Sequence, residues 1–228
     1  MARLLIFLVF ISCVISDSGA QSAKAVELSS EPSHRAVDAE FGVYQAFDVE
    51  VAPHGATPLH WHRHDSICVT LGDADIREEI EGKRPVELKL KDGDVRFIPG
   101  TFAHIERNLS DQPFHSLTIE LLNGRAGQKS LRRKSKQIFP GGSVETLFVR
   151  DRVRLSEIYL DPGASSPSSD YEGQTLVVPI TNVNLQGEIN GWEPMTGKFS
   201  RGYIGLLPEG YKNLGEKPAR FVTLVFEK

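Results

Sequence analysis

The sequence predicts an all-β protein made of two tandem barrel-like domains. Short stretches in which apolar and polar residues alternate recur along the chain, with Gly and Pro between them. Val86–Lys91, for example, alternates strictly and ends in the hairpin signal Asp92-Gly93. Because no stretch has a convincing long helical period, we expect short strands joined by turns, as in a barrel or sandwich.

The second half of the chain repeats the first at an offset of about 100 residues, which indicates two copies of one domain and not a solenoid. Three pairs of segments carry the repeat: residues 47–57 with 156–165, Gly93–Pro99 with Gly202–Pro208, and Asn108–Pro113 with Asn213–Pro218. We therefore predict an N-terminal domain over residues 38–123, a linker over 124–142 and a C-terminal domain over 143–228.

Residues 1–20 have the pattern of an export signal. Arg3 precedes the apolar run Leu4–Ile15, and small residues follow, so we expect cleavage after Ala20. This predicts a periplasmic or secreted protein. A rival interpretation, in which Cys13 carries a lipid anchor, stays open.

Composition narrows the classes of partner. The 228 residues carry a net charge of −4 with both signs interspersed, which does not suggest a nucleic-acid binder. The N-terminal apolar run of about 12 residues is too short to span a bilayer comfortably, so no membrane span is expected.

Residues 21–37 are polar and weakly patterned, and they form either a leader or an edge strand. The number of subunits is left open, a homo-oligomer included.

Three of the seven histidines lie within five residues, at His60, His62 and His64. Alternate side chains on a strand share a face, so a His-x-His pair is a ready chelate for a metal ion. The alternation that follows places Asp65 in the same row as the apolar residues Ile67, Val69 and Leu71, which we interpret as the core-facing row. His60 and His62 belong to the opposite parity, so a bend or bulge is expected after His62.

Two stretches resemble the motifs of the cupin superfamily. The first motif is matched by Gly55, His60, His62, Asp65 and Gly72, with spacings shorter than usual and Asp in place of Glu. The second is matched by Gly93, Pro99, Gly100, His104 and Asn108, with Thr101 where the family has Gly. The resemblance implies two jelly-roll barrels in tandem. It covers almost all of the chain after the signal.

The resemblance also implies a metal site. Its ligands would be His60, His62, Asp65 and His104, with His64 as the alternative third ligand. Asp65 is preferred because it heads the inward row and keeps the six-residue gap to Gly72. Three imidazoles and one carboxylate suit a divalent ion such as Fe, Mn, Ni or Zn.

The function implied by the family is that of a dioxygenase-like metalloenzyme acting on a small oxygenated or aromatic molecule. A protein that binds a small ligand without catalysis is the alternative, because one fold hosts both. The C-terminal copy is expected to be degenerate, because no histidine follows His115. His34, His54 and His115 stand alone and are interpreted as surface or capping residues, and Cys68 as a packing residue.

Overall fold

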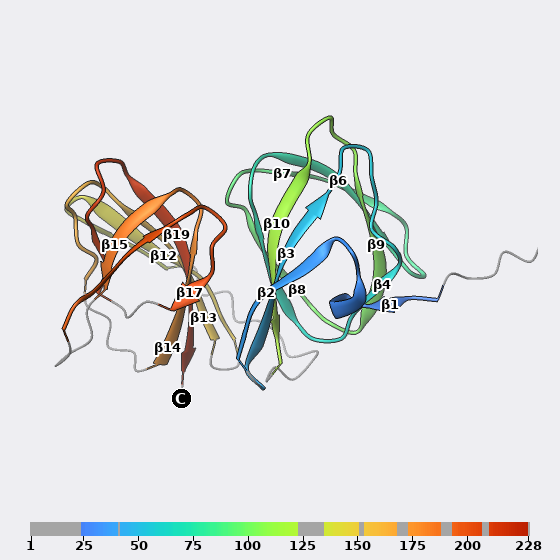
Figure 1. Cartoon of the computed structure of the whole chain (residues 1–228), viewed down its shortest axis with the longest axis horizontal. Coiled ribbons are helices and arrows are strands. Elements are labelled where there is room, and N and C mark those ends of the chain that lie inside the picture. Colours follow the sequence, from blue (N-terminus) through green and yellow to red (C-terminus); the bar gives the residue numbers. More distant parts are fainter. Residues whose placement is uncertain are drawn as a thin grey trace, which may run out of the picture.

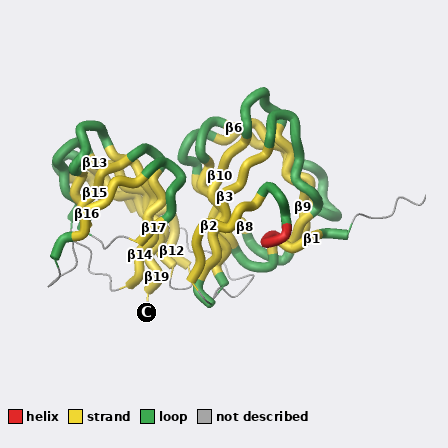
Figure 2. The backbone as a smooth tube through the Cα atoms, viewed as in Figure 1, coloured by secondary structure: helices red, strands yellow, loops and turns green. Residues whose placement is uncertain are grey.

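The computed structural model describes residues 24–40, 42–122, 135–150, 153–167, 173–187, 193–206 and 210–227. They form two lobes that lie side by side, an N-terminal one in blue to green and a C-terminal one in yellow to red (Figure 1). Strands dominate both lobes, with one short 3-10 helix in the described part of the chain (Figure 2). The all-β prediction is confirmed. The expected signal over residues 1–20 lies outside the described residues.

Two five-stranded sheets build the N-terminal lobe. We call them the β4 sheet, with the order β1-β4-β9-β6-β7, and the β5 sheet, with the order β2-β3-β10-β5-β8. The elements are β1 (Val26–Glu27), η1 (Leu28–Ser30), β2 (His34–Glu40), β3 (Tyr44–Val51), β4 (His60–His62), β5 (Ser66–Thr70), β6 (Ala74–Ile80), β7 (Val86–Leu90), β8 (Val95–Ile98), β9 (Phe102–Asn108) and β10 (Phe114–Leu121).

The C-terminal lobe has a six-stranded sheet, β11-β12-β13-β19-β14-β17, and a three-stranded sheet, β16-β15-β18. The elements are β11 (Ser135–Phe139), β12 (Gly142–Arg150), β13 (Val153–Leu160), β14 (Gly173–Pro179), β15 (Val183–Gly187), β16 (Met195–Phe199), β17 (Gly205–Leu206), β18 (Lys212–Asn213) and β19 (Ala219–Glu227). Strand β11 and the start of β12 fall within the predicted linker, whose residues 124–134 lie outside the described part.

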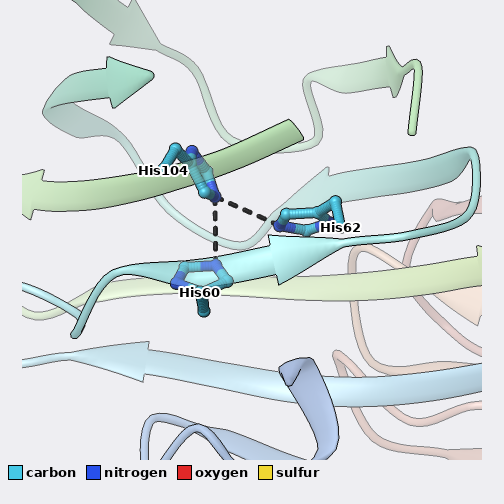
Figure 3. A group of neighbouring side chains, drawn as sticks. All are labelled: His60, His62 and His104. Carbon is cyan, nitrogen blue, oxygen red and sulfur yellow. Dashed lines mark hydrogen bonds between the residues drawn. The ribbon is translucent and has the colours of Figure 1, made fainter. Parts of the chain in front are cut away.

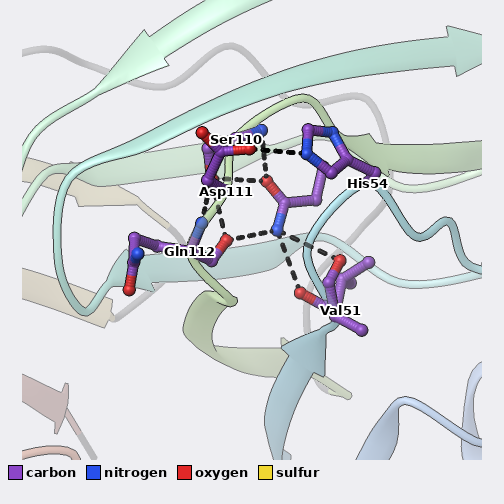
Figure 4. Close-up of polar contacts among 7 residues, drawn as sticks. Val51, His54, Ser110, Asp111 and Gln112 are labelled. Atoms are coloured by element: carbon purple, nitrogen blue, oxygen red, sulfur yellow. Dashed lines mark hydrogen bonds and ion pairs between the residues drawn. The ribbon is translucent and has the colours of Figure 1, made fainter.

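A buried asparagine ties two turns together in the N-terminal lobe. The Asn108 amide donates hydrogen bonds to the carbonyl oxygens of Val51 and Gln112, at 3.1 and 2.7 Å, and its own oxygen accepts one from the Ser110 backbone at 3.0 Å (Figure 4). One side chain thereby joins the end of β3 to the β9–β10 turn. This explains in physical terms why an Asn stands at this place in the sequence.

The C-terminal lobe repeats this arrangement. The Asn213 amide donates to the carbonyl oxygens of Leu160 and Lys217, at 3.1 and 2.8 Å, and its oxygen accepts from the Gly215 backbone at 2.9 Å. Leu160 ends β13, the strand that matches β3. The structure therefore builds the same polar link at both copies of the repeated Asn segment.

The largest apolar cluster lies between the lobes. It joins residues of the β5 sheet, such as Leu117 and Ile119, to residues of the six-stranded sheet, such as Leu155 and Leu224, all fully buried. Polar contacts flank it: Arg220 and Arg201 donate to the backbone oxygen and the carboxylate of Asp92, at 2.9 and 2.5 Å. Burial of apolar surface thus holds the two lobes together.

The row of apolar residues on β5 faces the other lobe and not the interior of its own. Ile67, Val69 and Leu71 belong to the cluster between the lobes. The alternate residue Cys68 lies opposite Arg96 on the neighbouring strand β8. Arg96 reaches carboxylates on the β4 sheet, so this second row points between the two sheets. The row therefore faces a core, as expected, but that core lies between the lobes, because the second lobe buries the outer face of the sheet.

The weakly patterned segment over residues 21–37 is part of the N-terminal lobe from Val26 onward. It forms β1, η1 and the start of β2, and Leu28 is buried in the core of this lobe together with Phe47 and Phe114. β2 is the outer strand of the β5 sheet, which agrees with the prediction of an edge strand for this segment.

None of the described helical residues forms a segment with the length and apolarity that a membrane crossing needs.

Candidate metal centre

Three histidines from two neighbouring strands converge inside the N-terminal lobe. His60 and His62 lie on β4, and His104 lies directly opposite His60 on the antiparallel partner β9. The Nε2 atom of His104 is 3.0 Å from that of His60 and 3.1 Å from that of His62 (Figure 3). All three side chains are buried, and their ligand atoms lie within 4.8 Å of one another.

The geometry of these nitrogens fits a cation. The Nδ1–H of His60 donates to the carbonyl oxygen of Pro58 at 2.9 Å, which leaves the Nε2 lone pair of His60 facing the cluster. His104 has one Nε2 proton at most when neutral, and so cannot satisfy both neighbours. An ion among the three Nε2 atoms would accept all three lone pairs at once.

The electrostatic setting keeps the three imidazoles neutral. Burial is the main cause in each case: it lowers the pKa of His60 to about 4, of His62 to about 3 and of His104 to about 2. The neighbouring imidazoles push the pKa of His62 and His104 in the same direction. Neutral imidazole is the form that binds a metal ion, so the donors need lose no proton near neutral pH.

The turn before β9 holds the ligand strands in place by close backbone contact. Thr101 donates from its backbone to the carbonyl oxygen of His62 at 2.6 Å. A Cβ on Gly100 would lie 2.4 Å from the His64 backbone, so only glycine fits there. Thr101 has φ of 71°, which agrees with the glycine that the cupin motif has at this place.

Asp65 and His64 lie outside the converging group. The buried Asp65 carboxylate accepts a hydrogen bond from the Gly100 backbone at 2.8 Å and so links the β4–β5 connection to the turn before β9. His64 instead lines a separate cavity of about 120 Å³, together with Trp61, Arg63 and Glu120. A role for either residue as a further ligand stays a prediction.

A polar group lies beside the histidines in the lobe interior. Arg96 on β8 donates to Glu78 on β6 at 2.5 Å and lies 3.6 Å from Glu106 on β9, two residues after His104. Burial raises the pKa of Glu106 to about 7. The Cys68 sulfur is 3.8 Å from Arg96, and burial raises the pKa of its thiol, which agrees with a packing role.

Sequence reasoning missed two residues next to the site. His34 is buried, and its ring centroid lies 5.0 Å from that of His60. Its Nδ1–H donates to the buried carboxylate of Glu31. The interpretation of His34 as a surface residue is therefore wrong. Only the separation of three positions between the acid and the imidazole could have pointed to the pair, and that signal is common in any sequence.

The other two isolated histidines agree better with their expected surface role. His54 is exposed and pairs with Asp111 at 2.7 Å (Figure 4), and His115 is partly exposed and pairs with Asp48 at 2.5 Å.

Phe102 stacks on the His62 ring at 5.2 Å and so forms a wall of the site. Trp61 instead lies under the Arg63 guanidinium, 5.4 Å from the ring centroid.

The C-terminal lobe has no comparable group among its described residues. Its interior is an apolar cluster that includes Leu185, Tyr211 and Phe221. The rings of Tyr211 and Phe221 meet edge to face at 5.2 Å. Since the chain has no histidine after His115, this lobe offers no imidazole to a metal ion. Residues 168–172, the counterpart of the histidine segment, lie outside the described part.

Comparison with known proteins places the chain by its structure. No protein-family model and no curated protein matches the sequence. Oxalate decarboxylase from Bacillus subtilis matches with a TM-score of 0.59 and 12% identity, over 81% of this chain and 69% of that one. Salicylate 1,2-dioxygenase from Pseudoaminobacter salicylatoxidans, in complex with gentisate, matches with a TM-score of 0.58 and 13% identity, over the same shares.

AerE from Microcystis aeruginosa matches with a TM-score of 0.59 and 14% identity, over 87% of this chain and 99% of that one. Mn(II) centres are described for the Bacillus subtilis decarboxylase. These neighbours are cupin-fold proteins, and at such low identity the likeness shows the fold alone. Together with the three converging imidazoles, it establishes a cupin fold with a site for a divalent metal ion.

Proposed function

We propose that this chain is an exported, metal-dependent cupin enzyme of the dioxygenase-like class, which acts on a small oxygenated or aromatic molecule. The observation that carries the proposal is the convergence of three neutral imidazoles at His60, His62 and His104 inside one lobe. Three protein ligands leave positions open on a divalent ion, as catalytic metal sites require.

We assign a separate role in the proposed enzyme to each group of residues around the site. The three histidines would hold an ion that supplies Lewis acidity or oxygen activation when bound. Phe102 would fix the plane of the His62 ring, and Arg96 with Glu78 and Glu106 would give the lobe interior a polar wall for oxygen atoms of the substrate. Sheets on both sides would exclude bulk water.

A degenerate second cupin domain belongs to the same proposal. The repeated Asn network and the apolar interior of the C-terminal lobe support it. Residues that stabilise the turns and the core recur in this lobe, whereas the histidine ligands do not. We infer that this lobe acts as a scaffold that covers the outer face of the β5 sheet.

The experiment begins with the metal content of the purified chain after expression with Fe, Mn, Ni and Zn supplied. Oxygen uptake and product formation are then followed with catechols, flavonols and small diketones, and with oxalate and gentisate. Turnover by the unaltered chain that is absent in the His104→Ala chain would support the enzyme function. Bound Fe or Mn without turnover of any substrate would contradict it.

A non-catalytic binding protein is the second candidate. It rests on the same buried group: His60, His62 and His104 are only 0 to 3% exposed, and one fold can use such a site for binding as well as for catalysis. In that case the ion would hold a small ligand without changing it. Calorimetric binding of a ligand that is recovered unchanged, in the metal-loaded chain only, would support this function.

Export is proposed from residues 1–20 alone. N-terminal sequencing of the secreted protein should find Gln21 as its first residue. Material that still begins with Met1 would contradict export by cleavage, and a lipid on Cys13 would support the rival interpretation.

A further inference from the structure

The N-terminal segment Val26–His34 covers the outer edge of the strand that carries two of the three histidines. Strand β1 pairs in parallel with β4, with Val26 opposite His60, and the Val26 backbone donates to the Leu59 carbonyl oxygen at 2.9 Å. In the β4 sheet, β4 lies between β1 and β9. Without this segment, β4 would be an edge strand with unpaired backbone groups.

The same segment places a carboxylate–imidazole pair against His60. The side chains of Glu31 and His34 are 0 and 3% exposed, and the His34 Nδ1–H donates to the Glu31 carboxylate. The His34 ring lies between two rings, 5.0 Å from His60 and 6.0 Å from Phe47. This ring contact therefore restricts the orientation of the His60 ring.

A third contact lies at the end of β4. The Arg63 guanidinium donates two hydrogen bonds to the Glu27 carboxylate, one of them at 2.7 Å. The pair is half exposed, so it adds little stability by itself. It does fix the register in which the segment lies against β4. Backbone pairing, ring packing and this ion pair all join the segment to the strand of His60 and His62.

We propose that Glu31 and His34 are positioning residues of the metal centre, and that metal occupancy and the docking of Val26–His34 are coupled. The proposal rests on the three-histidine site. His34 holds the ring of His60 and Glu31 holds His34, so the Nε2 atom of His60 stays aimed at the other two. Partners that hydrogen-bond to metal ligands typically change metal affinity by about 10- to 100-fold. His34 contacts His60 by ring packing, so we expect an effect at the lower end of that range.

Coupling works in both directions. If loss of the segment's contacts weakens metal binding by a given factor, metal binding must favour the docked segment by the same factor. The effect can therefore be measured from the metal side by substitution and from the segment side without any substitution.

The first measurement is Co²⁺ affinity, by competition with a chromophoric chelator, together with the visible absorption of bound Co²⁺. His34→Ala should weaken Co²⁺ binding by at least about tenfold and change the spectrum. Glu31→Gln keeps an oxygen that accepts from the His34 Nδ1–H and should stay close to the unaltered chain, whereas Glu31→Leu should resemble His34→Ala. His54→Asn is the matched control, because it breaks an exposed histidine–carboxylate pair elsewhere and should change nothing.

Two outcomes separate this proposal from the site on which it rests. A chain that binds no Co²⁺ at all overturns both the metal centre and the coupling. Tight binding that His104→Ala abolishes, but His34→Ala and Glu31→Leu leave unchanged, overturns the coupling alone.

The second measurement is amide hydrogen exchange of the unaltered chain, which holds even if the His34 variant fails to fold. Addition of Zn²⁺ should slow exchange of the Val26 and His34 amides, whose hydrogen bonds are at 2.9 and 3.0 Å. Strand β7, at the opposite edge of the same sheet, is the control and should change little. Equal slowing in both places, or none in the segment, would contradict the coupling.

Discussion

Metal affinity should be almost independent of pH between 5.5 and 7.5. A histidine with an ordinary pKa of about 6.5 is about nine-tenths protonated at pH 5.5, so three such ligands would lose roughly 1000-fold in affinity. Burial lowers the pKa of His60 to about 4, of His62 to about 3 and of His104 to about 2. All three therefore stay neutral at pH 5.5, and we expect a change of less than about twofold.

The same shifts have a consequence for stability. These histidines take up protons on unfolding below pH 6.5, because their pKa values are lower in the folded chain. The free energy of unfolding is therefore not reduced by these histidines above pH 6.5. It falls as the pH drops from 6.5 toward 4, because the unfolded chain binds protons that the folded chain does not. At pH 5.5 each histidine accounts for a loss on the order of 1 kcal/mol, or a few kcal/mol for the three together, in the metal-free chain.

The assay is Zn²⁺ competition with a chelator of known proton affinity, at pH 5.5 and 7.5, with circular dichroism to verify that the chain is folded at both. The His104→Ala chain shows how much binding arises elsewhere. A drop in affinity near 1000-fold between the two pH values would refute the reasoning, because it would mean that the imidazoles are protonated as in water.

Four further outcomes are expected. His60→Ala and His62→Ala should each lower bound metal by at least about tenfold, and full occupancy by elemental analysis in either would contradict the assigned ligands. Asp65→Ala should lower bound metal and His64→Ala should not; the reverse would assign His64 as the ligand. Burial raises the pKa of Glu120 to about 7, so its ionisation costs stability as the pH rises from 4.5 to 7. Glu120→Gln should therefore stabilise the chain more at pH 8 than at pH 5 in urea unfolding, and an equal effect at both would count against the shift. A chain truncated after residue 123 exposes the outer face of the β5 sheet and should self-associate in light scattering; a stable monomer would argue against the scaffold role of the C-terminal lobe.

The sequence predicts the fold class and the metal site because both depend on local patterns. Strand alternation and the spacing of Gly93, Pro99 and Asn108 are properties of neighbouring residues, and through the family resemblance this spacing identifies His104 as a ligand before any contact is known. The structure adds what the sequence did not predict: His104 lies directly opposite His60 on an antiparallel strand.

Features that depend on contacts distant in sequence could not be predicted. Alternation in Ile67, Val69 and Leu71 shows that one face is apolar, but it cannot say whether a lobe interior or a neighbouring domain buries that face. The position of His34 against His60 depends on how a weakly patterned segment crosses the lobe, and no periodicity encodes it. In both places tertiary packing decides the role of a residue.

The apolar cluster between the lobes explains how the first lobe can keep a polar interior. In the described residues, His62 Nδ1, His104 Nδ1, Ser66 Oγ and Thr70 Oγ1 are buried without a hydrogen-bond partner. Each such group costs about 1–3 kcal/mol, so a domain that depended on its interior alone would be weakened by them. Here the outer face of the β5 sheet is buried against the second lobe, and this burial offsets the cost. Among its described residues the second lobe fills its own interior with apolar side chains, and this packing lets it contribute stability to the chain.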